Sequence, residues 1–266
     1  MKKTKKTLPE ACESFREGAK NKVRRYKRMI FLGHEIWMEG PNHGHVGKRA
    51  EFLLKFGQNM KLDGRLSSAM AKATLFSPAG QKREIFLCFD PNLTREAYIV
   101  SFSLEEKGLY TLLLEYDGGI WSRGKDGRLY YAPRSKCQEV EKAVRYCQYS
   151  KVIVPVEIGT EGDIPQPCGC EMEIVPVKYQ RFAAGDEIAL KVLYDGSPFP
   201  NIAVSAIHSD KEQVAEGKTD SSGQAGFKLT DPGNWMFLAR HVDAEKGVPG
   251  EFDEKTVTAV LSLPGG

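Results

Sequence analysis

The sequence predicts an all-β protein made of two antiparallel β-sandwich domains, and three observations indicate this class. Short apolar runs alternate with polar residues at a period of two, turn residues punctuate these runs at close intervals, and a single segment after the first 32 residues has helical spacing. The 266 residues suffice for two domains of about 100–150 residues each. A composition of 41% hydrophobic and 27% charged residues is ordinary for a globular protein with a sizeable core.

Residues 1–32 predict a basic leader that is flexible or poorly packed. They hold eleven Lys or Arg against three Glu, a balance of +8, whereas the remainder holds 27 basic against 32 acidic residues, a balance of −5. The leader has few aromatic residues among its charges and no recognisable nucleic-acid-binding motif, so we expect no nucleic-acid partner. Its basic stretch Arg24–Arg28 precedes only the four apolar residues Met29–Leu32, whereas a signal peptide has roughly 7–15. We therefore expect no export signal in the chain as written.

The first domain is expected to span residues 33–158 and to consist of short strands. Alternating or continuous apolar runs predict these strands at residues 50–56, 85–89, 98–104, 110–116 and 152–156. The Asp117-Gly118-Gly119 sequence is expected to end the strand before it. Cys88 lies inside an apolar run, which predicts a small core residue.

One segment, Arg134–Tyr149, predicts a short helix that bridges the two halves. Val140, Val144 and Cys147 fall at i, i+4 and i+7, the spacing that places side chains on one face of a helix. Residues 159–169 are rich in Gly and Pro and predict the linker between the domains.

Residues 170–264 predict the second sandwich, with the regular alternation of an immunoglobulin-like fold. Its strands are expected around the apolar residues at 188–194, 202–206, 225–229, 235–239 and 257–263. Glycines at 196, 223 and 233 fall in the turns between these strands, where their freedom to adopt a positive φ is useful.

The second domain resembles the carboxypeptidase-regulatory and transthyretin-like sandwich modules. The resemblance lies in the strings YDGSPFPNIAVSA and GKTDSSGQAGFKLTDPGNWMFLARH, which begin at Tyr194 and Gly217. From His34 onward, the chain also resembles a domain-of-unknown-function family described as the periplasmic component of cobalt/nickel ABC uptake systems. That resemblance rests on GHEIWMEGP, FGQNMKLDG, EMEIVPV, VLYDGSPFPNIAV and PGNWMFLARH, which occur in the expected order.

The family resemblance implies an extracytoplasmic protein that is accessory to nickel or cobalt uptake, with membrane transporter subunits as partners. It also implies that His34 corresponds to the mature N-terminus of exported relatives, where a free α-amine could join the imidazole as a metal chelate. The chain departs from the family in two places. The leader is basic and barely apolar, and Gln58 stands where relatives often carry a His. The second departure weakens the case for metal binding.

Four histidines are the candidate metal ligands: His34, His43, His45 and His241. The His43-Gly44-His45 sequence presents two imidazoles near each other, and neutral imidazole suits Ni, Co, Cu and Zn. Its spacing matches no closed zinc motif, and the alternative is a solvated or capped turn. His241 ends its strand, as the family pattern places it, although a rim histidine bonded to a loop is the alternative there. This alternative is favoured for both His241 and His208, although His241 has the better case for a ligand.

The cysteines leave several possibilities open. Cys168-Gly169-Cys170 could bind a soft metal, although no second Cys pair at zinc-ribbon spacing accompanies it. Cys137 and Cys147 could cross-link to this loop if the protein is exported. Disulfides or buried inert thiols are favoured over a metal, and the disulfide state is not fixed by the sequence.

The sequence favours a binding protein over an enzyme. It contains no nucleophile elbow, phosphate loop, zincin helix or dinucleotide fingerprint. Trp37, Trp121 and Tyr130-Tyr131 could line a ligand cleft, but packing in the core or a turn is the commoner outcome. The leading hypothesis is a non-enzymatic accessory to nickel or cobalt uptake, with zinc or copper as other possible ions. The alternative is a structural or adhesive envelope module that binds protein or carbohydrate without metal.

Overall fold

The computed structural model describes residues 33–89, 97–158, 164–180, 182–211 and 213–265. The predicted leader, 1–32, lies outside this part of the chain, as does the first portion of the predicted linker. The described residues from Glu35 onward form one compact unit. The strands are β1 (Glu35–Glu39), β2 (Arg49–Gln58), β3 (Lys61–Leu62), β4 (Ala71–Phe76), β5 (Lys82–Ile85), β6 (Tyr98–Ser103), β7 (Gly108–Gly124), β8 (Leu129–Tyr130), β9 (Val140–Val156), β10 (Met172–Pro176), β11 (Glu187–Tyr194), β12 (Ser197–Pro198), β13 (Ala203–His208), β14 (Gln213–Lys218), β15 (Gln224–Lys228), β16 (Trp235–Asp243) and β17 (Glu254–Leu263).

The predicted all-β class is confirmed. The described residues contain two short 3-10 segments, η1 (Ser68–Met70) and η2 (Arg134–Lys136), and otherwise strands, turns and loops. None of the helical segments in that part of the chain has the length and apolar character needed to cross a membrane.

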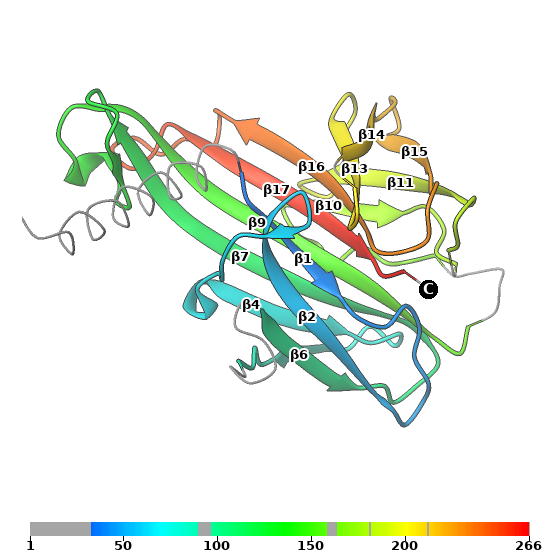
Figure 1. The fold of residues 1–266 in the computed structure, drawn as a ribbon. Helices are drawn as coiled ribbons and strands as arrows, with labels where there is room; N and C mark the ends of the chain where they lie inside the picture. Colours follow the sequence, from blue (N-terminus) through cyan, green and yellow to red (C-terminus); the bar gives the residue numbers. More distant parts are fainter. Residues whose placement is uncertain (1–32, 90–96, 159–163, 181, 212, 266) are drawn as a thin grey trace, which may run out of the picture. The chain divides into compact units, whose positions relative to one another are not determined.

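Three sheets build the unit (Figure 1). One four-stranded sheet contains β1, β2, β3 and β6, and a second contains β10, β11, β12 and β15. The third is a nine-stranded sheet with the order β14-β13-β16-β17-β9-β7-β4-β5, in which β8 also pairs with β7. We call it the shared sheet, because its strands come from both predicted halves of the chain.

The shared sheet is continuous because β17 pairs with β9. These two strands run parallel, from the pair Glu254 and Val144 to the pair Ser262 and Val152, and Figure 1 shows them side by side. All the other strand pairs are antiparallel in the described part of the chain, apart from one isolated parallel bridge. The last strand of the chain thus joins the second half to the end of the first.

The predicted helix at Arg134–Tyr149 is wrong. Only the three-residue η2 is helical there, and the segment continues as strand β9 from Val140 onward. The spacing of Val140, Val144 and Cys147 fits a helix by coincidence, because β9 is paired with β7 on one side and with β17 on the other. β-branched and aromatic residues such as Val144 and Tyr146 suit a strand packed between two neighbours.

Two further predictions in the first half are corrected. Asp117-Gly118-Gly119 does not end its strand: β7 continues to Gly124 through a bulge between Asp117 and Gly119, where φ of Gly119 is 72°. Cys88 is exposed and outside the core. The apolar run there fails to form a buried strand because β5 ends at Ile85, leaving only a bridge from Cys88 to Ile99.

The two smaller sheets cover opposite faces of the shared sheet. Successive residues of a strand point to opposite faces, and Met236 and Phe237 on β16 illustrate this. Phe237 belongs to a core cluster with the β10–β11 sheet, which also includes Ile153 and Leu261. Met236 belongs to another cluster, in which Trp37 of β1 is fully buried. The first described strand therefore packs on strands that come from the second half.

Candidate functional site

His43 and His45 lie close together on the loop after β1. The Gly44 amide donates a hydrogen bond of 2.9 Å to the Pro155 carbonyl, which fixes the loop against the end of β9. The two imidazole centroids are 5.4 Å apart, and the ring planes are nearly perpendicular, at 83°. His45 is exposed and His43 is half-buried. The structure thus brings two of the four predicted ligands together at the surface.

Asn42 orients the first of these imidazoles. Its Oδ1 atom accepts a hydrogen bond of 2.7 Å from Nδ1 of His43. A ring nitrogen that donates in this way leaves the other nitrogen, Nε2, as the one with a free lone pair. Asn42 is not among the predicted ligands, although an amide beside a histidine in a turn is a recognisable signal.

Glu157 supplies a carboxylate near the same loop. Its Oε1 accepts a hydrogen bond of 3.2 Å from the Val46 amide, and Lys107 Nζ is 3.2 Å from Oε2. The hydrogen bonds from Lys107 and Val46 lower the pKa of Glu157, and the nearby His45 acts in the same direction. Glu157 follows β9 directly, and sequence reasoning missed it because the contact forms only when β9 meets the loop.

The other two predicted ligands have different surroundings. His34 is 3% exposed. His241 lies near the end of β16, where its ring meets Tyr194 and Phe199 edge-on at centroid distances of 5.0 and 4.8 Å. Within the described ranges, no three His, Cys, Asp or Glu side chains are grouped closely enough to hold a metal ion. His34 and His241 stay predicted ligands.

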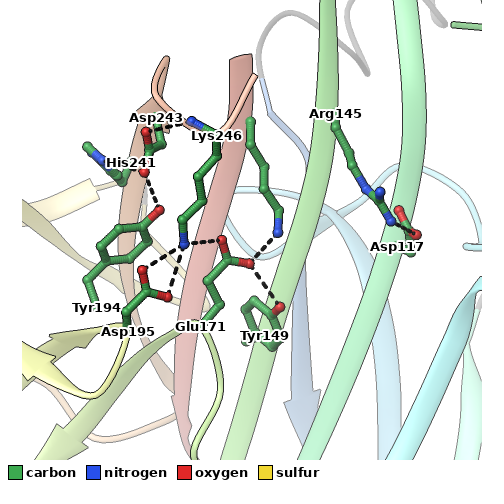
Figure 2. Close-up of polar contacts among 10 residues, drawn as sticks. Asp117, Arg145, Tyr149, Glu171, Tyr194, Asp195, His241, Asp243 and Lys246 are labelled. Carbon is green, nitrogen blue, oxygen red and sulfur yellow. Dashed lines mark hydrogen bonds and ion pairs between the residues drawn. The ribbon is translucent and has the colours of Figure 1, made fainter. Parts of the chain in front are cut away.

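A network of charged side chains lies beside His241 (Figure 2). Lys246 Nζ is 2.7 Å from Asp195 and 2.9 Å from Glu171. Glu171 also accepts a hydrogen bond from Lys255 and one of 3.3 Å from the Tyr149 hydroxyl. Burial opposes ionisation of Glu171, but the two lysines lower its pKa overall.

This network holds the turn after β16 in place. The Tyr194 hydroxyl donates a hydrogen bond of 2.6 Å to Asp243, and Asp243 accepts two further hydrogen bonds from the turn amides of Glu245 and Lys246. Each carboxylate in the network accepts hydrogen bonds from a lysine, a hydroxyl or a backbone amide, so the network stabilises the turn after β16. Farther along the sheet, Arg145 and Asp117 form a separate pair at 2.7 Å (Figure 2).

Cys168, Cys170 and Glu173 form a second cluster, just before and within β10. Glu173 accepts hydrogen bonds of 3.0 and 3.1 Å from the amides of Cys168 and Gly169. It also pairs with Lys151 of β9 at 2.8 Å, and both side chains of this pair are about 97–98% buried. Every described cysteine, including Cys137 and Cys147, is a free thiol.

Glu35 is a buried carboxylate on β1. Burial raises its pKa to about 7, while the charge of Arg240 and the amide of Asn59 act in the opposite direction. The Asn59 amide donates to Glu35 Oε2 at 3.1 Å. The sequence shows this residue only as a carboxylate beside His34, because its burial depends on how the sheets pack.

The remaining aromatic and histidine candidates pack structurally. Trp37 is fully buried in the core, and Trp121 of β7 packs against Tyr131 in a tilted arrangement, with the ring centroids 5.0 Å apart. Nε2 of His208 is 2.9 Å from the Pro232 carbonyl, and its Nδ1 accepts the Asp210 amide at 3.2 Å. The alternative of a histidine bonded to a loop is therefore confirmed for His208.

The fold and these side chains define a class: a β-sandwich protein whose candidate ligand-binding groups lie on loops and at strand ends. The chain belongs to the family described as a domain of unknown function, DUF4198, whose model matches residues 31–243. A comparison with curated proteins gives no match.

Several solved structures are similar at low sequence identity. A DUF4785 family protein from Legionella pneumophila has 9% identity and a TM-score of 0.29, with 76% of this chain and 50% of that chain covered. The present chain thus spans half of that protein's length. A segment of two fibronectin type III domains from chicken tenascin has 12% identity and a TM-score of 0.21, with 84% and 96% covered. A Salmonella alpha-2-macroglobulin mutant has 12% identity and a TM-score of 0.27, with 86% and 14% covered.

Proposed function

We propose that this protein is a non-enzymatic binding protein that is accessory to nickel or cobalt uptake and holds the ion through His43 and His45. The observation that carries the proposal is the 5.4 Å separation of their imidazole centroids. Two imidazoles that share one ion, each at about 2.1 Å from a ring nitrogen, have centroids roughly 5 Å apart. The pair is therefore close to the spacing that shared coordination requires.

Two neighbours support the same role. Asn42 holds Nδ1 of His43 and leaves Nε2 to bind the ion. Glu157 lies near His45 as a carboxylate with a lowered pKa, and it could reach the ion by exchanging Lys107 for it. Water would complete the coordination. A site with two protein ligands and open positions suits an ion that is received and handed on.

The family resemblance supplies the remaining parts of the proposal. It supports an extracytoplasmic location and membrane transporter subunits as partners, and the glycine-marked turns of residues 170–264 support a transthyretin-like module as the scaffold. His34 and His241 stay within the proposal as additional ligands, to be tested separately from the pair.

Isothermal titration of the purified chain with Ni, Co, Zn and Cu salts tests the proposal. We expect binding of at least one ion with a Kd below about 100 µM, weakened at least tenfold in His43→Ala and in His45→Ala, which is about 1.4 kcal/mol. Lys48→Ala, an exposed change in the same loop, is the matched control and should leave Kd unchanged. His34→Ala and His241→Ala show whether these residues add to the site.

Absence of binding tighter than about 100 µM would overturn the metal proposal. So would binding that survives both substitutions in the loop. The competing hypothesis is an envelope module that binds protein or carbohydrate without metal. Capture of a partner from envelope extract that persists after treatment with EDTA would favour it.

A further inference from the structure

Cys168 and Cys170 are placed as an accessible thiol and a sheltered one. Cys168 is half-buried, whereas Cys170 is 8% exposed. Gly169 between them has a φ of 81°, a left-handed conformation that only glycine adopts readily, and it turns the chain so that the two side chains meet. The Cys170 thiol donates a hydrogen bond to the sulfur of Cys168. The two sulfur atoms are therefore already neighbours.

The surroundings hold this turn rigidly. Both carboxylate oxygens of Glu173 accept amides of the turn, from Cys168 and from Gly169. Glu173 is itself fixed by the buried ion pair with Lys151. The turn that carries the two cysteines is thus held by Glu173 of β10 and, through it, by Lys151 of β9.

The electrostatics differentiate the two thiols. The hydrogen bond from Cys170 lowers the pKa of Cys168; the charge of Lys151 acts in the same direction, and burial and the charge of Glu173 act in the opposite one. The same hydrogen bond, together with burial, raises the pKa of Cys170. A thiolate is the nucleophile in exchange reactions, so Cys168 is the sulfur prepared to attack and Cys170 the one that resolves.

We propose that Cys168 and Cys170 form a thiol–disulfide exchange site, in which the accessible sulfur attacks an external disulfide and the sheltered sulfur then closes the ring. In the first step, the Cys168 thiolate forms a bond to one sulfur of the external disulfide, and the other sulfur leaves as a thiolate. In the second step, Cys170 loses its proton to that thiolate and attacks Cys168, releasing the second external thiolate. The external disulfide gains two electrons, and the pair becomes a disulfide.

Exchange fits this site better than metal binding does. In the described part of the chain, no three His, Cys, Asp or Glu side chains are grouped closely enough to hold a metal ion, whereas exchange needs only the two thiols. A ring closed over one intervening residue is tight, and strained disulfides are readily reduced again. A cavity of about 310 Å³ is lined by Pro165–Pro167, which directly precede Cys168 in the chain, and by Phe76–Pro78.

Oxidation of the reduced chain by oxidised glutathione tests the proposal. After acid quenching and alkylation, trypsin releases residues 152–178, a peptide that contains Cys168, Cys170 and no other cysteine. We expect this peptide to lose two hydrogens as its disulfide forms, and to become resistant to alkylation. The rate of this reaction should be at least ten times the rate at which Cys137 is glutathionylated. Cys170→Ser should accumulate the Cys168–glutathione mixed disulfide, and Cys168→Ser should form neither product.

The exposed Cys88 provides the matched control, because Cys88→Ser should leave the ring closure unchanged. Circular dichroism of each variant verifies the fold. A wild-type peptide that remains fully alkylated while Cys88 becomes glutathionylated would overturn the proposal. Alkylation of Cys168 in the Cys170→Ser variant at a rate no faster than that of Cys137 would also count against the proposal. Both outcomes are measured on protein whose fold has been verified, so misfolding does not explain them.

Discussion

Glu35 shows how burial alone can make a single carboxyl group sensitive to pH. Its pKa in the folded protein is about 7, against an ordinary value of 4.5. The folded state therefore holds a proton that the unfolded chain has already released between these two values. Stability must fall as the pH rises from about 4.5 to about 7, because the unfolded state binds fewer protons there.

The substitution Glu35→Gln should remove this decrease of stability with rising pH. In the wild type, the free energy of unfolding is expected to fall by up to about 3 kcal/mol between pH 5 and pH 8 through this group. The variant keeps an acceptor for the Asn59 amide but cannot ionise. Urea unfolding at the two pH values measures the difference, and Glu51→Gln on the exposed side of β2 is the control. Equal slopes in wild type and Glu35→Gln would contradict the argument.

The buried Lys151–Glu173 pair predicts a different response. Lys151→Met leaves the Glu173 carboxylate buried without its cation, a change that typically costs about 3–5 kcal/mol. Because two turn amides still bond to Glu173, we expect the lower end of this range. Chemical denaturation measures the loss. In the double variant Lys151→Met/Glu173→Gln, at least about 1 kcal/mol should return, since the uncompensated charge is gone.

The exposed pair of Lys125 and Glu139 is the comparison for this effect. Its side chains are 66% and 74% exposed, so Lys125→Met should change stability by less than about 1 kcal/mol. A loss in Lys151→Met no larger than that in Lys125→Met would mean that the buried pair contributes nothing beyond a surface contact.

At the scale of elements, the bulge in β7 depends on Gly119. Its φ is 72°, and a Cβ atom there would collide with the Tyr131 ring. Gly119→Ala should therefore destabilise the protein by about 1–3 kcal/mol through strain and displaced packing. Gly226→Ala in β15 is the matched control, because a Cβ atom meets nothing within 4 Å there. Thermal unfolding compares the two, and equal melting temperatures would show that the bulge tolerates a side chain.

Strands with one buried face and one more exposed face could be predicted from the sequence, because their apolar and polar residues alternate. Phe52 and Leu54 of β2 follow the period of two because their side of the strand is buried, whereas Glu51 on the other side is exposed. β9 does not show this alternation of apolar and polar residues. Its neighbours cover both faces, so Val152, Ile153 and Val154 are all buried, and chance spacing at its start imitated a helix.

The candidate site was predictable only in part, for a similar reason. His43 and His45 are near each other in sequence, and the chain itself keeps them together. Glu157 joins them from the end of β9, 112 residues after His45. This contact depends on the bridge between Gly44 and Val156 at the end of β9, and neither composition nor period encodes that pairing.

At the scale of the whole molecule, the two predicted halves share structural parts. β17 pairs with β9 over nine residues. β1 packs on β17, where the Met38 amide donates a hydrogen bond of 3.0 Å to the Ser262 hydroxyl. Trp37 is buried among Met236, Leu238 and Val260. Neither half can unfold without exposing apolar surface and an unpaired strand of the other.

We therefore expect residues 35–266 to unfold in one cooperative transition. Calorimetry should give a van't Hoff enthalpy close to the calorimetric one, as for a two-state domain. A fragment of residues 33–158 would lose β17, which leaves an edge on β9 and an open site around Trp37, so we expect it to aggregate or to show no cooperative melt. Two separate transitions in the whole chain, or a cooperatively folded fragment, would instead mean that the boundary at 159–169 divides two independent domains and that the shared sheet is only an interface between them.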